Sequence, residues 1–116
     1  MNFPIYAPVR GAYYRGQHAI DALARIVTAP DTARWDLVPE PSNPHDPNAV
    51  QVHLHGEHVG YIGREWAGQI SEALRSGTRL SARLDHWLNE QTPVLEIAEP
   101  EAEEVPVEEV VTDVGA

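Results

Sequence analysis

The stretch that begins at Pro39 reads Pro39-Glu-Pro-Ser-Asn-Pro-His-Asp-Pro-Asn-Ala-Val-Gln-Val52. Prolines alternate in it with short polar residues, so the backbone path is restricted while several polar side chains remain free to point outward. At its end, Val50, Val52 and Leu54 alternate with polar residues, which is typical of a strand with one buried face. The sequence therefore predicts a stiff polar loop, suited to hold a ligand, that leads into a central strand.

The segments on either side of this loop predict further short strands and two helices. Gly56 turns the central strand into a second strand at residues 59–62, so that the two form a hairpin. Apolar residues recur at helical spacing in residues 17–28 and 64–76, and Pro30 and Gly77 follow these two segments. The other strands are expected at residues 5–10, 34–38, 80–85 and 93–97, with a break at residues 11–16. Six strands and two helices fit a small α+β barrel that is mostly β.

The tryptophans indicate where the core lies. Trp35 shares one face of its strand with Leu37, and Trp66 shares one face of the helix at residues 64–76 with Ile70, Ala73 and Leu74. We expect Trp35 and Trp66 in the core. Trp87 lies near a strand end and fits either the core or the surface.

The acidic residues are concentrated at the C-terminal end. The net charge is −10, and residues 96–116 hold eight acids and no base, whereas residues 1–95 hold eight arginines and ten acids. We expect one folded domain over residues 1–98 and a disordered acidic tail over residues 99–116. The tail can occupy a basic groove as a mimic of nucleic acid, bind a partner, or serve solubility, and solubility needs the fewest assumptions.

The composition restricts the classes of function. The chain has no cysteine, which excludes thiolate chemistry, disulfides and cysteine-type zinc sites. No segment approaches the roughly 20 apolar residues of a membrane span, and the N-terminus lacks the pattern of a signal peptide, so we expect a cytoplasmic protein without membrane contact. All eight basic residues are arginine, which either suits bidentate phosphate contacts or reflects the codon composition of the genome.

Two patterns bear on metal-dependent catalysis. His53, His55 and His58 resemble, locally, the metal motif of metallo-β-lactamase-like hydrolases, but here the motif crosses a strand and a hairpin turn, so we expect at most adventitious zinc or nickel binding. Glu40 and Asp46 are a pair of acids, yet the chain has no lysine to support a metal-dependent nuclease. We expect no catalytic residue, no cofactor and no functional metal, and a metal-dependent hydrolase is the third-ranked function.

Several pieces occur in the order typical of the HIRAN domain, over residues 5–95. Gly11-Ala-Tyr-Tyr14 resembles the family's small-residue turn with paired aromatics, and the helix from Gln17 resembles the one in bacterial members. Residues 37–52 resemble the central signature of the family. Val59-Gly-Tyr-Ile62, with Arg64 at the start of a helix, resembles the segment that follows it. The chain is therefore similar to a small, single-domain HIRAN protein of the bacterial type.

The resemblance implies a modified OB-like or SH3-like barrel that captures the 3′ end of single-stranded DNA in DNA repair, without catalysis. Paired tyrosines would stack on terminal bases, one carboxylate would accept a hydrogen bond from the free 3′-hydroxyl, and an arginine at a helix N-terminus would pair with a phosphate. The residues expected at the DNA are Tyr13, Tyr14, Ser42, Asn43, Asp46, Tyr61 and Arg64.

Ala12 departs from the family pattern, since eukaryotic repair members carry a basic residue directly before the aromatic pair. Arg10 and Arg15 are the nearby candidates for auxiliary phosphate contacts. The expected partners are single-stranded DNA or DNA ends, together with a repair or replication protein, and the expected state is a monomer. The alternative function is a protein-interaction module that keeps the barrel and does not bind DNA, as an acidic chain without lysine would suggest.

Structural roles compete with these assignments. Asp46 can cap its own loop through Asx-type bonds to the amides of Asn48 or Ala49, and Asn43 can stabilise the turn before Pro44. The two tyrosines can pack in the core or at its rim instead of stacking on bases. Whether Tyr13, Tyr14, Asp46, Tyr61 and Arg64 face one shared pocket decides between these interpretations.

Overall fold

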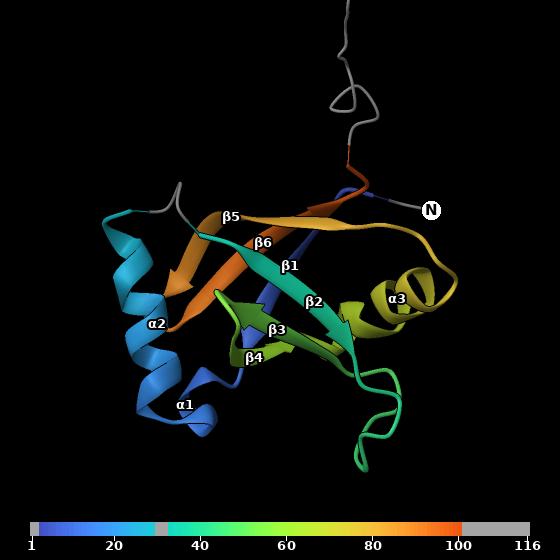
Figure 1. The fold of residues 1–116 in the computed structure, drawn as a ribbon, viewed down its shortest axis with the longest axis horizontal. Helices are drawn as coiled ribbons and strands as arrows, with labels where there is room; N and C mark the ends of the chain where they lie inside the picture. Colours follow the sequence, from blue (N-terminus) through green and yellow to red (C-terminus); the bar gives the residue numbers. More distant parts are fainter. Residues whose placement is uncertain (1–2, 30–32, 101–116) are drawn as a thin grey trace, which may run out of the picture.

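The computed structural model describes residues 3–29 and 33–100, which form six strands and three helices (Figure 1). In chain order these elements are β1 (Ile5–Arg10), α1 (Ala12–Arg15), α2 (Gln17–Val27), β2 (Trp35–Pro39), β3 (Val50–Leu54), β4 (Glu57–Ile62), α3 (Arg64–Arg75), β5 (Ser81–Asn89) and β6 (Thr92–Ala98). No helix of the described part has the length and apolar character needed to cross a membrane.

All six strands belong to one antiparallel sheet with the order β2-β3-β4-β1-β6-β5. The sheet twists and curls so that its two edge strands, β2 and β5, approach each other (Figure 1). A curled half-barrel results. In Figure 1, α2 and α3 lie at opposite sides of it, and the loop after β2 projects at the end where α3 begins.

The concave face of the sheet forms the core. Val50, Val52 and Leu54 of β3 are fully buried, which confirms the alternating strand that the sequence predicts. Trp35 is 7% exposed and belongs to the core, as expected, whereas Trp66 and Trp87 are partly buried and pack against it. The convex face therefore carries the polar residues of β3 and β4.

The helices cover the open sides of the sheet with narrow apolar faces. α2 buries Ala19, Ala22, Leu23 and Ile26 and packs on β4. α3 buries its face at Ala67, Ile70, Ser71 and Ala73, and it packs against β2 and β3. Two of these positions, Ala67 and Ser71, lie on the buried face although the apolar pattern of the sequence does not include them.

The structure corrects two expectations about the elements. Residues 11–16 are not an irregular break, because α1 forms there between Gly11 (φ 89°) and Gly16 (φ 104°). Both have a positive φ, which glycine tolerates, and Gly11 is in the left-handed helical conformation. β5 extends to Asn89 instead of ending at Asp85. Register shifts at Leu84/His86 and Trp87/Asn89 interrupt the alternation that sequence analysis depends on.

The end of the domain is only partly described. Glu99 and Pro100 follow β6, and residues 101–116 lie outside the described residues. The domain boundary at residue 98 and the disordered acidic tail therefore remain predictions from charge and composition.

Candidate nucleic-acid interface

The side chains of Asn43 and Asp46 organise the proline-rich loop. Asn43 Oδ1 accepts hydrogen bonds from the amides of His45 (2.8 Å) and Asp46 (3.0 Å), and Asp46 Oδ1 accepts one from the amide of Asn48 (2.9 Å). These are the Asx-type bonds that competed with a role in ligand binding. Asp46 Oδ2 is not used in them and lies 3.7 Å from Arg64 Nε, so this oxygen faces the N-terminus of α3.

Glu40 anchors the loop to the sheet. Its Oε1 accepts hydrogen bonds from Gln51 Nε2 (3.0 Å), the Tyr61 hydroxyl (2.8 Å) and Asn43 Nδ2 (3.4 Å). The hydrogen bond from Gln51 has the largest effect on the pKa of the Glu40 carboxyl, and the bond from Tyr61 the next largest. Both lower this pKa, so Glu40 is ionised at neutral pH. The sequence pattern suggested Glu40 only as a metal ligand and gave no sign of this anchoring role, because Gln51 and Tyr61 are distant from it in the sequence.

A cavity of about 240 Å³ opens beside this loop. Its lining joins the loop, β4 and the first residue of α3, and consists of Asn43, His45, Asp46, Ala49, Tyr61, Ile62 and Arg64. Four of the seven expected site residues, namely Asn43, Asp46, Tyr61 and Arg64, therefore meet in one cavity. His45 is an addition that sequence analysis missed, although its place between Asn43 and Asp46 was a usable signal. Ser42 is exposed on the loop and is not among the lining residues.

Tyr61 is held in a defined orientation at the cavity wall. Burial raises the pKa of the Tyr61 hydroxyl, and its hydrogen bond to Glu40 raises it further. The hydroxyl therefore remains protonated at neutral pH and donates to Glu40.

Arg10 is the register partner of Tyr61 across β1 and β4, and Arg10 Nη2 lies 3.5 Å from Glu65 Oε2. One of the two expected auxiliary arginines is thus adjacent to the wall.

The paired tyrosines lie on α1 and point into solvent. Tyr13 is 71% exposed and Tyr14 is 87% exposed, so neither packs in the core. Their rings are nearly perpendicular, at 83°, with centroids 5.6 Å apart. Neither lines the cavity, but Arg15 on the same helix is close enough to influence the pKa values of His58 and Tyr61. α1 therefore flanks the outer face of β4.

Three aromatic rings form a continuous row on the convex face of β3 and β4. His53 and His58 are stacked, with centroids 5.2 Å apart and planes 3° from parallel, and Tyr61 meets His58 edge-on at 4.9 Å. His53 Nε2 bonds Gln51 Oε1 at 2.7 Å, and His58 Nε2 bonds the carbonyl oxygen of Gly60 at 3.0 Å. We call His53, His58 and Tyr61 the aromatic strip.

The three histidines of the motif do not converge on one point. His55 lies in the hairpin turn with φ 52° and is exposed, while His53 and His58 stack on each other. Over residues 3–29 and 33–100, no three His, Cys, Asp or Glu side chains come together in a way that would hold a metal ion. His55 is therefore not part of the stacked pair of His53 and His58.

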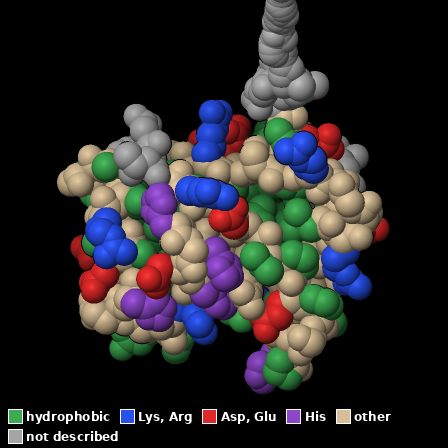
Figure 2. Space-filling model, in the orientation of Figure 1, with side chains coloured by type: hydrophobic (Ala, Val, Ile, Leu, Met, Phe, Trp, Pro, Cys, Tyr) green, Lys and Arg blue, Asp and Glu red, His purple; other side chains and the backbone are tan. Residues whose placement is uncertain are grey.

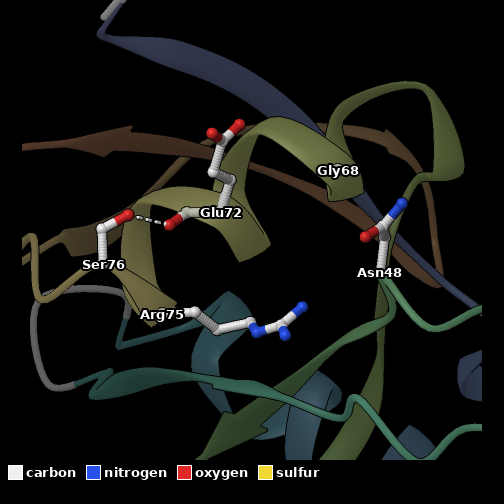
Figure 3. Close-up of a pocket in the computed structure, with 5 residues that line it drawn as sticks. All are labelled: Asn48, Gly68, Glu72, Arg75 and Ser76. Carbon is white, nitrogen blue, oxygen red and sulfur yellow. Dashed lines mark hydrogen bonds between the residues drawn. The ribbon is translucent and has the colours of Figure 1, made fainter.

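A second cavity, of about 600 Å³, lies between α3 and Asn48 at the end of the proline-rich loop (Figure 3). Asn48, Gly68, Glu72, Arg75 and Ser76 line it. In Figure 3, Arg75 extends into the space between α3 and Asn48, while Glu72 lies on the helix and Ser76 caps its C-terminal end. The second cavity is larger than the first, but it contains none of the expected site residues and its charges are mixed. The smaller cavity is therefore the candidate site.

The fold and the cavity together define a small, mostly β domain with one candidate binding site. The family model of the HIRAN domain matches residues 5–96, so the chain belongs to the HIRAN domain family. HIRAN domains are in general DNA-binding modules and are not typically catalytic. A search of curated protein sequences gives no match.

Two solved structures resemble the fold. One is a protein from Lactobacillus plantarum, with a TM-score of 0.68 and 23% identity over 79% of this chain and 87% of that chain. The other is the HIRAN domain of human HLTF, with a TM-score of 0.61 and 21% identity over 80% of this chain and 71% of that chain. They confirm the predicted fold class, a mostly β, OB-like α+β domain.

Proposed function

We propose that this domain binds the 3′ end of single-stranded DNA in the 240 Å³ cavity, without catalysis, and that it acts in DNA repair or processing. One observation carries the proposal: Asp46, Tyr61 and Arg64, which come from three separate elements, line one cavity. The DNA-binding character of the family supports it.

Asp46 is the residue that would select a strand end. Its Oδ1 is occupied by the Asn48 amide, whereas its Oδ2 makes only the 3.7 Å ion pair with Arg64 Nε and can also accept a hydrogen bond from a free 3′-hydroxyl. The side chain is 21% exposed, so solvent screens its charge only in part. A phosphate at the same position would be repelled by Asp46 and by ionised Glu40. A terminal nucleotide with a 3′-hydroxyl is therefore the ligand that fits.

The surrounding side chains supply phosphate and base contacts. Arg64 is 80% exposed at the first position of α3, so its guanidinium and the positive end of the helix dipole can both bind a phosphate. The exposed rings of Tyr13 and Tyr14 offer surfaces for base stacking, which contributes about 1 to 3 kcal/mol per base without sequence preference. Arg10 and Arg15 flank β4 as auxiliary cations.

The test compares oligonucleotides, labelled at the 5′ end, that carry either a 3′-hydroxyl or a 3′-phosphate. Fluorescence anisotropy at low salt should show about tenfold or greater preference for the 3′-hydroxyl, since a hydrogen bond to a charged group contributes about 1.5 to 3 kcal/mol. Asp46→Asn should remove this preference. The variant keeps an oxygen for the Asn48 amide and loses only the charge, so the loop remains intact.

Asp85→Asn is the matched control, because Asp85 is exposed on β5, away from the cavity, and this variant should behave like the wild type. Equal binding of the two strand types by the wild type would contradict 3′-end recognition. No binding of either strand at low salt would instead support the protein-interaction alternative, which the net charge of −10 favours.

A further inference from the structure

We infer that the aromatic strip binds the nucleotides that precede the terminal one, by stacking their bases on His58 and His53. This inference rests on the proposed function and extends it from the strand end to the path of the strand. The strip begins at Tyr61, which lines the cavity, and continues through His58 to His53. A DNA strand whose 3′ end lies at Asp46 can therefore leave the cavity along the surface of β4 and β3.

The geometry of the strip suits a stacking surface. The imidazoles of His53 and His58 lie 3° from parallel, and both are only partly buried. Hydrogen bonds to Gln51 and to the backbone of Gly60 hold their orientations, so little side-chain entropy is lost on binding. Figure 2 shows histidine side chains gathered over β3 and β4.

His58 would bind a base by stacking and not a phosphate by charge, because its imidazole is neutral at pH 7. Burial lowers the pKa of His58, and the nearby charges of Arg15 and His53 lower it further, so His58 is neutral at pH 7. A neutral ring can stack on a base without removing a charge from water. Phosphates on either side of the stacked bases would face Arg10, on β1, and Arg15, on α1.

The opposite side of the strip is less favourable for phosphates. Asp36 is the register partner of His53 on β2, and its carboxylate lies 3.8 Å from Arg34 Nε. Glu57, in contrast, lies on the helical side of the strip, at the start of β4, where its Oε1 is 3.8 Å from His18 Nε2 of α2. Glu40 is held at the cavity end by Gln51 and Tyr61. The backbone of a bound strand is therefore expected on the α1 side of the strip.

The test measures how affinity depends on strand length. A dinucleotide reaches only the cavity, whereas a hexanucleotide also reaches the strip, and both carry a 3′-hydroxyl. The double variant His53→Ala/His58→Ala should weaken hexanucleotide binding by about tenfold or more, since the stacking of two bases is lost. Dinucleotide binding should remain unchanged. Replacement of both histidines by Phe should restore hexanucleotide binding, because it keeps the flat rings and removes the titratable nitrogens.

His55→Ala/His86→Ala is the matched control, since both histidines are exposed and lie outside the strip. The inference fails if the His53→Ala/His58→Ala variant binds the hexanucleotide like the wild type. It also fails if this variant weakens the binding of the dinucleotide and of the hexanucleotide equally, which would mean a general distortion of the sheet. If the stacking inference fails but the wild-type protein still prefers a 3′-hydroxyl to a 3′-phosphate, the proposed function stands. If the wild-type protein shows no such preference, the proposed function and the stacking inference both fail.

Discussion

Single residues of the proline-rich loop serve both the fold and the candidate site. Asp46 uses one carboxylate oxygen to hold the Asn48 amide and presents the other toward Arg64. Asn43 uses its carbonyl oxygen for two loop amides and its amide nitrogen for Glu40. A carboxylate has two oxygens and can serve the loop and a ligand at once. The side-chain oxygen of Asn43 is already used by two loop amides, and one N–H of its amide group is used by Glu40.

Asn43→Ala should therefore destabilise the domain and loosen the cavity together. It removes the acceptor for the amides of His45 and Asp46, and we expect a loss of about 1 to 2 kcal/mol in the free energy of unfolding. Urea denaturation followed by tryptophan fluorescence measures it. Ser42→Ala is the control at the adjacent, exposed position and should change stability by less than about 0.5 kcal/mol. Equal stability of the two variants would mean that Asn43 does not organise the loop.

At the scale of the elements, the contact between β1 and β4 joins the two halves of the sheet, β2-β3-β4 and β1-β6-β5, and places Tyr61 beside Arg10. The register pairs are Val9 with Ile62 and Arg10 with Tyr61. Gly60 makes this approach possible, because a Cβ at that position would lie 2.6 Å from the carbonyl oxygen of Arg10 and 2.9 Å from Val9 Cγ1. The close neighbour is backbone and cannot rotate away.

Gly60→Ala should consequently separate β1 from β4 and destabilise the domain by about 3 kcal/mol or more. Thermal unfolding followed by circular dichroism measures the effect. Gly68→Ala provides the matched control on α3, since its Cβ would meet only Asn48 Nδ2 at an ordinary 3.6 Å, and alanine favours the helix by up to about 1 kcal/mol. Similar melting temperatures for the two variants would show that the contact between β1 and β4 adapts to the extra methyl group.

At the scale of the whole molecule, the distribution of charge limits affinity for DNA. The chain carries −10 overall, and cutting it after Pro100 removes six acids and leaves −4. Those six acids lie outside the described residues. A polyanion such as DNA is repelled by net negative charge over distances of about 10 Å at 0.1 M salt.

Truncation after Pro100 should therefore tighten single-strand binding several-fold at low salt, with a smaller gain at high salt. Anisotropy titrations at two salt concentrations measure the difference. A full-length chain in which the six tail acids are replaced by the corresponding amides should bind like the truncated one if charge is the cause. Unchanged affinity on truncation would leave the tail as a solvated appendage.

The fold was predictable wherever one element carried its own pattern. The buried alternation of β3 and the apolar faces of α2 and α3 appear within one or two residues of their expected limits. β5 was predicted too short because its bulges break the alternation, and α1 was missed because a helix of four residues has no periodicity to detect. Local patterns predict elements only while those elements are regular.

Four of the seven residues expected at the DNA share one cavity, and their role in binding stays a prediction. Asn43, Asp46, Tyr61 and Arg64 share one cavity, as the family resemblance implied, while Tyr13 and Tyr14 lie outside its lining. The Glu40 anchor and the stacking of His53 on His58 were not predictable, because both depend on the register between strands. A shift of one residue would place these side chains on opposite faces of the sheet.

The amino-acid sequence by itself determined the family, the mostly β fold class, the buried faces and the stiff polar loop, since each depends on short-range pattern and on restricted backbone conformations. Only the tertiary structure decided which side chains meet. Pairing of β3 with β4 aligned the aromatic strip, and the Glu40 carboxylate joined the loop to Gln51 and Tyr61. Contacts between residues that are distant in the sequence exist only once hydrophobic burial has closed the sheet.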